Sequence, residues 1–262
     1  MTAYRVVQVD AFAPRAFEGN PAAVMPLEVW LPDATMQAIA AENNVAETAF
    51  TVSSKRDDAD YDLRWFTPTV EVDLCGHATL ASAHVLIEGE AIRFSTRSGI
   101  LTVTRGDGGL LNLDLPAFAV VPGVEPGLLD GLGLPADTPT FLGRGGNGTA
   151  IALLGDEAAV RAVAPDFRAL RTIDRLVIIT APGTATDIAS RVFAASHGID
   201  EDPVTGSAHA ALVPFWAERL GRTRFTAFQA STRGGHLDCE LAGDRVILGG
   251  QCVTVIEGHF QL

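Results

Sequence analysis

The stretch CGHAT at residues 75–79 has a counterpart in TGSAH at residues 205–209. Each places a glycine and a polar residue directly before an apolar run with helical spacing, so each predicts the start of a helix. Each is also preceded by a Gly-Asn pair: Asn20 lies 56 positions before the glycine of the first stretch, and Asn147 lies 59 positions before that of the second. This order predicts an internal repeat and therefore two similar lobes.

The remaining patterns predict an α+β fold in which strands outnumber helices. Short β-branched runs bounded by Gly, Asp or Pro indicate strands, and Gly221 stands where the last helix should be capped. A segment rich in Pro, Gly and Val near 116–126 suggests a seam between an N-terminal lobe, 1–118, and a C-terminal lobe, 119–262, whose last strand can return to the first lobe. The predicted strands are 5–12, 45–52, 99–105, 109–115, 150–154, 175–180, 192–195, 237–241 and 252–257, and the predicted helices are 33–42, 76–88, 157–164 and 207–220.

The composition excludes several functional classes. The chain has 32 Asp and Glu against 19 Lys and Arg, a formal net charge of −13, which disfavours nucleic acid and anionic lipid as partners. No apolar stretch reaches the roughly 18 residues of a membrane span, and the N-terminus has a strand pattern without a signal sequence. Three cysteines without a CxxC pair favour a reducing compartment, so we expect a cytoplasmic protein.

The two predicted helix starts are candidate anion sites. Gly76 with His77, and Gly206 with Ser207, would present unpaired backbone N–H groups and a partial positive charge. Glycine lets a ligand approach that backbone closely. Many helices open in this way and bind nothing, but the occurrence of a matched pair favours a site that holds a carboxylate.

Two acidic residues are candidates for proton chemistry. Glu47 interrupts an apolar strand pattern; it is either an exposed edge residue or a sheltered carboxylate that can take and return a proton. The corresponding run in the second half, 175–180, has no acid. Asp202 lies in a solvated turn, or it lies beside the second helix start and orients His77 or a substrate; the sequence leaves both possibilities open.

Six blocks carry a resemblance to a known family. They are DAF at 10–12, GNPAAV at 19–24, ENNVAET at 42–48, CGHAT at 75–79, DPVTGSAH at 202–209 and GGQCVTV at 249–255. In this order they closely resemble the signature blocks of the PhzF-like proteins of phenazine biosynthesis, over nearly the whole chain.

The resemblance implies a diaminopimelate-epimerase-like fold: two lobes, each a mixed sheet wrapped around a central helix, with the active site between them. It also implies a homodimer without a cofactor or metal. The expected activity is a proton shift on a small carboxylate-bearing substrate, similar to trans-2,3-dihydro-3-hydroxyanthranilate isomerase. The residues that match the family's functional positions are Glu47, His77, Asp202 and Ser207 as catalytic residues, and Gly76, His77, Gly206, Ser207 and Asn20 as substrate-binding residues.

Three other functions are conceivable. A two-base racemase or epimerase could use Cys75, but the expected partner thiol is missing at 203–204, which are Pro and Val. A metal enzyme could use Cys75, His77 and His84, although their spacing matches no zinc finger or HExxH site. A non-catalytic protein could use the same site to bind a carboxylate.

Overall fold

The computed structural model describes residues 2–144 and 148–262. It divides into two compact units: unit 1 comprises Met1–Asp114 with Leu248–Leu262, and unit 2 comprises Leu115–Ile247. The sequence suggested lobes of 1–118 and 119–262 with a last strand that can return, and residues 248–262 belong to unit 1 here. Gly146 and Asn147, the second predicted Gly-Asn pair, lie outside the described residues.

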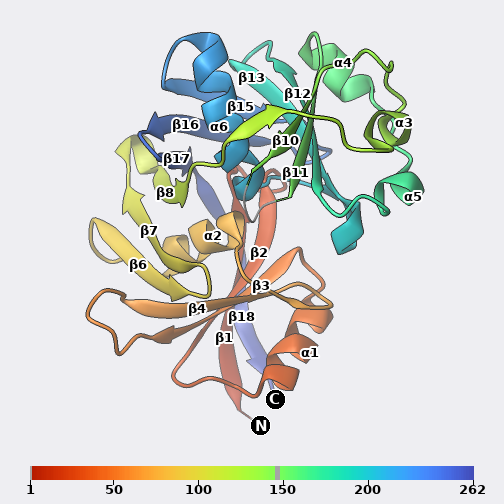
Figure 1. Ribbon diagram of the computed structural model, residues 1–262. Helices are drawn as coiled ribbons and strands as arrows, with labels where there is room; N and C mark the ends of the chain where they lie inside the picture. Colours follow the sequence, from red (N-terminus) through yellow and green to blue (C-terminus); the bar gives the residue numbers. More distant parts are fainter. Residues whose placement is uncertain (1, 145–147) are drawn as a thin grey trace. The chain divides into compact units, whose positions relative to one another are not determined.

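Unit 1 is a mixed sheet around one helix (Figure 1). Strand β1 pairs antiparallel with β2 and with β18, β2 runs parallel to β3, and β3 runs antiparallel to β4. Strand β4 pairs antiparallel with β5 and parallel with β6, and β6, β7 and β8 form an antiparallel meander. The elements are β1 (Ala3–Ala11), β2 (Asn20–Leu27), α1 (Asp33–Asn43), β3 (Glu47–Ser53), β4 (Tyr61–Phe66), β5 (Glu71–Val72), α2 (Gly76–Leu86), β6 (Ala91–Thr96), β7 (Gly99–Arg105), the 3-10 turn η1 (Asp107–Gly109), β8 (Leu111–Pro116) and β18 (Cys252–Gln261).

The central helix of unit 1 is α2, whose first eight residues are all buried. Its sequence, GHATLASAHVL, is apolar or small on every side, as expected for a helix enclosed by other elements. It packs against β1, β2, β3, β7 and β18. Its buried hydroxyls bond back to the helix: Thr79 Oγ1 donates to the Cys75 carbonyl at 2.6 Å and Ser82 Oγ to the Ala78 carbonyl at 2.7 Å. The start of α2 is therefore held in one position.

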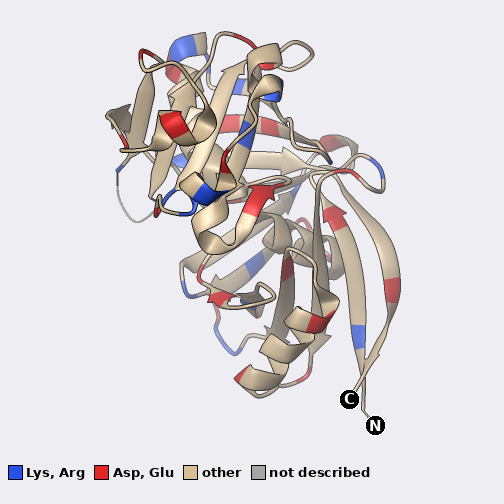
Figure 2. Ribbon diagram, turned by 90° about the vertical axis from the view of Figure 1, so that its right-hand side faces the viewer, with Lys and Arg blue, Asp and Glu red and all other residues tan. Residues whose placement is uncertain are grey.

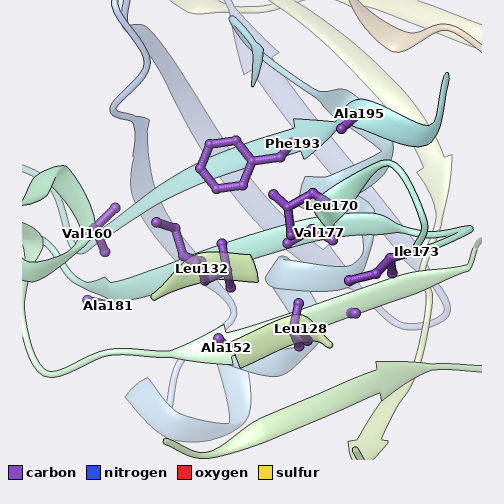
Figure 3. Close-up of a cluster of buried hydrophobic side chains, with 12 residues drawn as sticks. Leu128, Leu132, Ala152, Val160, Leu170, Ile173, Val177, Ala181, Phe193 and Ala195 are labelled. Carbon is purple, nitrogen blue, oxygen red and sulfur yellow. The ribbon is translucent and has the colours of Figure 1, made fainter. Parts of the chain in front are cut away.

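In unit 2 the long helix α6 is buried along most of its length. A second hydrophobic core lies between its strands and the short helices α3 to α5, with Phe193, Val177 and Leu170 in its middle (Figure 3). The elements are β9 (Val120–Pro122), α3 (Leu128–Leu132), β10 (Thr140–Gly143), β11 (Thr149–Leu153), α4 (Glu157–Ala162), α5 (Phe167–Leu170), β12 (Leu176–Pro182), β13 (Ile188–Ala194), the 3-10 turn η2 (Ala195–His197), β14 (Ile199–Asp202), α6 (Gly206–Leu220), β15 (Arg224–Gln229), β16 (Gly235–Ala242) and β17 (Arg245–Gly250).

Helix α6 tolerates a proline in its interior. Pro214 has no N–H group, so the Ala210 carbonyl four residues earlier loses its helical donor. The backbone N–H of Phe118 donates to that carbonyl at 2.9 Å and restores the bond. The helix ends at Gly221, which is left-handed with φ 65° and supplies the predicted cap. Trp216 Nε1 donates to Thr180 Oγ1 on β12 at 3.0 Å and ties the buried helix to the sheet.

The strand pairing of unit 1 recurs in unit 2. The parallel pair β2–β3 corresponds to β11–β12, the antiparallel pair β3–β4 to β12–β13, and the parallel pair β4–β6 to β13–β15. Registers match as well, because the residue two positions after each Gly-Asn pair, Ala22 or Thr149, pairs with the first residue of the next parallel strand, Glu47 or Leu176. The predicted α+β fold of two similar lobes, each with a mixed sheet around a central helix, is thus confirmed. Every predicted strand and helix is present, with ends shifted by at most four residues.

Charged residues of both signs are interspersed over both units (Figure 2). Many arginines are paired; Arg64, for example, contacts Glu71 at 2.7 Å and Asp33 at 2.9 Å. Within residues 2–144 and 148–262, no helix combines the length and apolar character that crossing a bilayer requires.

Candidate functional site

Glu47 is a sheltered acid. It is the first residue of β3 and its residue exposure is 8%. Strand β3 is paired on both sides, with β2 and with β4, so Glu47 is not on a sheet edge. Of the two interpretations that the sequence allowed, an exposed edge residue is therefore wrong. A buried carboxylate needs a partner, because an isolated charge is costly to remove from water.

The partner of Glu47 is His77, the second residue of α2, which is also buried. His77 Nε2 lies 3.0 Å from Glu47 Oε2. This contact satisfies the distance of an ion pair, although neither atom forms a well-aligned hydrogen bond within the described part of the chain. The two groups come from different elements, and the register of β3 and the first turn of α2 bring them together.

The other ring nitrogen of His77 has two neighbours. The Asn20 side-chain nitrogen lies 3.2 Å from Nδ1, and Cys75 Sγ lies 3.5 Å from the same atom. Asn20 begins β2 and is 0% exposed. The Asn20 amide N–H donates to Nδ1 when the imidazole is neutral, and in the charged ring Nδ1 donates to Cys75 Sγ instead.

The electrostatics of this cluster favour a charged imidazole. Burial acts to lower the pKa of His77, but the neighbouring Cys75 and Glu47 raise it well above its ordinary value. Burial raises the pKa of the Cys75 thiol to about 11, so this thiol is protonated near neutral pH. Glu47 is the acidic partner of this imidazole, 3.0 Å from Nε2.

The start of α2 has no side-chain cap. Its N-cap residue is Cys75, in an extended conformation, and no side chain hydrogen-bonds across the cap. The first turn, with Gly76 and His77, contains no acidic residue. The backbone N–H groups of a first turn have no partner inside the helix, so this end can receive an anion.

Unit 2 places Asp202 in a different kind of network. Thr205, the N-cap residue of α6, donates from Oγ1 to Asp202 Oδ2 at 2.5 Å. Its backbone N–H donates to Gln229 Oε1 at 2.9 Å, and Gln229 Nε2 donates to the Asp202 carbonyl at 2.7 Å. Asp202 and Gln229 are buried. Asp202 is therefore no solvated turn residue; its predicted action on His77 or on a substrate stays a prediction.

Gly206 and Ser207 begin α6 as Gly76 and His77 begin α2. Gly206 is buried and Ser207 is half-buried. Thr205 is a residue type that usually caps a helix, yet its hydroxyl is bonded to Asp202 and provides no cap. No side chain therefore caps the first-turn N–H groups of α6. This is the condition for the anion site that the sequence predicts there.

His209 is the last residue of the block at 202–209, and the sequence assigned it no role. It is 0% exposed, and burial lowers its pKa to about 4. Its Nδ1 lies 2.9 Å from the Thr205 carbonyl, so this nitrogen carries the proton and donates. Nε2 is buried without a partner among the described residues. Neutral His209 thus holds the N-cap residue of α6 in place through this hydrogen bond.

The predicted site residues fall into two groups, one in each unit. Asn20, Glu47, Gly76 and His77 gather in unit 1, while Asp202, Gly206 and Ser207 lie in unit 2. That both groups serve one substrate stays a prediction. The sequence missed Thr205 and Gln229 as partners of Asp202. Thr205 could have been found from its position beside the predicted helix start, whereas the sequence carries no such signal for Gln229.

Two details of the alternatives are corrected. The N-cap position of Cys75 corresponds to Thr205, so the counterpart of the thiol is a hydroxyl, one residue beyond the expected 203–204. His84 of the metal alternative contacts Thr254 Oγ1 at 3.0 Å. The described group that could hold a metal consists of Glu47, Cys75 and His77.

Comparison with known proteins gives one consistent result. The model of the family described as "Phenazine biosynthesis-like protein" matches residues 9–258. An uncharacterized isomerase of Pseudomonas aeruginosa is 50% identical over 262 residues, which covers 97% of this chain and 97% of the relative. The human phenazine biosynthesis-like domain-containing protein is 37% identical and covers 95% and 96% of the two chains.

Solved structures agree with these sequence matches. A PhzF-family protein of Enterococcus faecalis has a TM-score of 0.90 at 44% identity and covers 100% of both chains. A hydroxyproline epimerase of Agrobacterium vitis, solved with bound trans-4-hydroxy-L-proline, has a TM-score of 0.62 at 12% identity, over 98% of this chain and 92% of the other. The latter is a likeness of fold alone. The predicted epimerase-like fold is thereby confirmed.

Proposed function

Because the chain belongs to the phenazine biosynthesis-like (PhzF-like) family, we propose that it is an isomerase in which Glu47 moves a proton on a small carboxylate-bearing substrate. The observation that carries the proposal is the buried pair of Glu47 and His77, with 3.0 Å between Oε2 and Nε2. An isomerase needs a group that accepts a proton at one atom and returns it at another. A carboxylate that is sheltered from water and held by an imidazolium fits that task.

Each neighbour of Glu47 has a distinct part in the proposed reaction. Glu47 takes an acidic proton next to a conjugated system of the substrate and returns it elsewhere on the same face. The His77 imidazolium balances the carboxylate charge and, as the proton is transferred, provides a donor at Nε2. Asn20 is a positioning residue, because it is fully buried and lies against Nδ1 of His77.

The helix ends have the role of anion donors in this proposal. The first-turn N–H groups of Gly76 and His77, and those of Gly206 and Ser207, hold the substrate carboxylate in place of an Arg or Lys. Asp202 acts through Thr205, whose hydroxyl it keeps away from the cap position of α6. The enzyme needs no cofactor for this chemistry, because a carboxylate and an imidazole complete the proton transfer between them.

An epimerase that uses Cys75 as a second acid is the alternative. It is supported by the 3.5 Å between Cys75 Sγ and His77 Nδ1. A thiol with a pKa of about 11 holds its proton, so Cys75 could donate a proton but would accept one poorly. Cys75→Ser decides between the two: undiminished turnover excludes the thiol, and a loss similar to that of a Glu47 variant favours epimerisation.

Solvent-deuterium exchange tests the role of Glu47. Small cyclic amino acids and hydroxy acids are first screened for binding by thermal shift, and each bound compound is then incubated with the protein in D2O and followed by NMR. We expect deuterium incorporation in the wild type and a decrease of at least about 100-fold in Glu47→Gln, because general acid–base catalysis contributes this much. The matched control is Glu42→Gln, an exposed residue of α1, which should keep the wild-type rate.

Two outcomes would contradict the proposal. Retained exchange in Glu47→Gln removes the assigned acid/base. Tight binding of a carboxylate by the wild type without exchange of any ligand proton favours a non-catalytic binding protein.

A further inference from the structure

Three ligand-type side chains meet in unit 1. Glu47, Cys75 and His77 each direct one potential metal-ligand atom into a region where all three atoms lie within 4.8 Å of one another. All three residues are buried. A carboxylate, a thiol and an imidazole are the donor types that zinc takes in proteins.

The separation of two of these atoms matches a tetrahedral ion. Zinc binds sulfur at about 2.3 Å and imidazole nitrogen at about 2.0–2.1 Å, so two such ligands at a tetrahedral angle lie about 3.5 Å apart. The distance from Cys75 Sγ to His77 Nδ1 is 3.5 Å. Both residues belong to the rigid start of α2, where Thr79 holds the Cys75 carbonyl. This edge of a coordination tetrahedron is therefore already formed.

Glu47 can supply the third ligand after its carboxylate leaves His77 Nε2, the ring nitrogen that Oε2 now contacts at 3.0 Å. The side chain has to rotate toward the Nδ1 side of the ring, and its candidate ligand atom lies within 4.8 Å of those of Cys75 and His77. The ion would take the Nδ1 atom that Asn20 now contacts at 3.2 Å. A fourth position stays open for water or a ligand anion, as in zinc sites with three protein ligands.

The charges of the cluster also suit a dication. A buried ion must be neutralised by its ligands, because an uncompensated charge in the interior is strongly unfavourable. Binding displaces the Cys75 thiol proton and the proton of His77 Nδ1 to solvent. The resulting thiolate and the Glu47 carboxylate supply two negative charges, and the neutral imidazole adds none. A zinc-sized dication with these three ligands forms a neutral unit.

We infer that Glu47, Cys75 and His77 bind one zinc-group dication, Zn²⁺ or its substitutes Co²⁺ and Cd²⁺, and that the bound ion blocks proton transfer. The block rests on the proposed function, because it occupies the carboxylate assigned as acid/base. Binding itself does not depend on that assignment. The ion in this inference is an inhibitor.

Cobalt absorption tests the binding. Metal-free wild-type protein is titrated with Co²⁺, and we expect one equivalent to produce a thiolate-to-cobalt charge-transfer band with the intense visible bands of tetrahedral cobalt. Cys75→Ser should lose the charge-transfer band. The matched control is Cys239→Ser, which removes a buried thiol of β16 in unit 2 and should keep the band.

A second measurement on the wild type covers the possibility that Cys75→Ser fails to fold. The ¹¹³Cd NMR signal of the cadmium-loaded protein should report a mixed sulfur, nitrogen and oxygen coordination. A wild type without a thiolate band, or a cadmium signal without sulfur, overturns the site. So does a band that disappears in Cys239→Ser.

Deuterium exchange then tests the block separately. With a ligand that exchanges in the wild type, one equivalent of Zn²⁺ should abolish exchange and a chelator should restore it. Bound cobalt with undiminished exchange overturns the block and leaves Glu47 as the proposed base. Retained exchange in Glu47→Gln contradicts the proposed function and leaves the metal-binding result in place.

Discussion

The starts of α2 and α6 share a backbone design. In each, an extended N-cap residue precedes a glycine, and no side chain caps the helix. In each, the side chain four residues after the N-cap donates back to the N-cap carbonyl: Thr79 at 2.6 Å in α2 and His209 at 2.9 Å in α6. A hydroxyl and an imidazole thus perform the same structural task in the two units.

The side chains around these helix starts differ. Where unit 1 has Glu47, unit 2 has Leu176, because both residues begin the strand paired parallel to β2 or β11. The residue after the glycine is His77 in α2 and Ser207 in α6. Both units have kept a side-chain hydrogen bond to the N-cap carbonyl, while the buried pair of an acid and an imidazole at the helix start lies in unit 1. Variants that exchange or remove these side chains test this comparison.

The largest expected effect is on the ion pair of unit 1. His77→Leu leaves the buried Glu47 carboxylate without its counter-charge, so we expect the free energy of unfolding to fall by about 3 kcal/mol or more at pH 7. The variant at the corresponding position, Ser207→Ala, should lose less than about 1 kcal/mol, because Ser207 is only half-buried. Urea unfolding followed by circular dichroism measures both, and equal losses would contradict the asymmetry.

The second effect is a pH dependence of opposite sign in the two units. His209 has a pKa of about 4 in the folded protein and about 6.5 when unfolded. Its stabilising contribution is thus complete above about pH 6.5 and is lost as the pH falls through 4, a loss of about 3 kcal/mol. For His77 the raised pKa means the reverse: its contribution is present below about pH 6.5 and is lost as the pH rises through the raised value.

His209→Thr separates these contributions, because it copies Thr79 of the other unit and does not titrate. The difference in unfolding free energy between the wild type and this variant should shrink from pH 7 to pH 4. A difference that stays constant over this range would show that the pKa of His209 is the same in the folded and the unfolded protein.

Much of this arrangement is local and was predictable. The helix starts, the Gly221 cap and the acid in strand 45–52 follow from spacing and residue type over short stretches. The networks are not local: Gln229 reaches Thr205 across 24 positions, and Asn20 reaches His77 across 57. No sequence pattern encodes such contacts, because they depend on which strands pair.

Strand β2 shows the same limit for the fold. It contains Pro21 and Pro26, which argue against a central strand, and the sequence did not predict it. It is nevertheless paired on both sides, with Pro21 opposite Asp10 of β1 and Pro26 opposite Thr51 of β3. Its neighbours on both sides outweigh the unfavourable residue type.

The third effect tests the network of unit 2. Thr205→Val keeps the shape of the residue but removes the donor to Asp202 Oδ2 and the acceptor for Gln229, so we expect a loss of about 2 kcal/mol. Thr205→Ser keeps the hydroxyl and should lose less than about 1 kcal/mol. Thermal unfolding compares the two, and similar losses would show that the methyl group matters more than the hydrogen bonds.

The smallest effect concerns Pro214 of α6. Pro214→Ala supplies an N–H group for the Ala210 carbonyl that Phe118 now serves. The gain of a helix-favouring residue and the loss of that bond should nearly cancel, leaving a change within about 1 kcal/mol. Amide hydrogen exchange at Phe118 should accelerate, because the new N–H group at position 214 competes with Phe118 for the Ala210 carbonyl. Unchanged protection of the Phe118 amide would show that the two donors do not compete.

Strands β1 and β18 lie side by side from Ala3 opposite Gln261 to Ala11 opposite Cys252 (Figure 1). On the ribosome, the nascent chain of unit 2 is therefore complete before β18 emerges, and it can fold first. At that point β1 of unit 1 still lacks one neighbour, and Thr254 is not yet present to contact His84 on α2. The acid and its imidazole partner thus belong to the unit whose last strand is synthesised after unit 2.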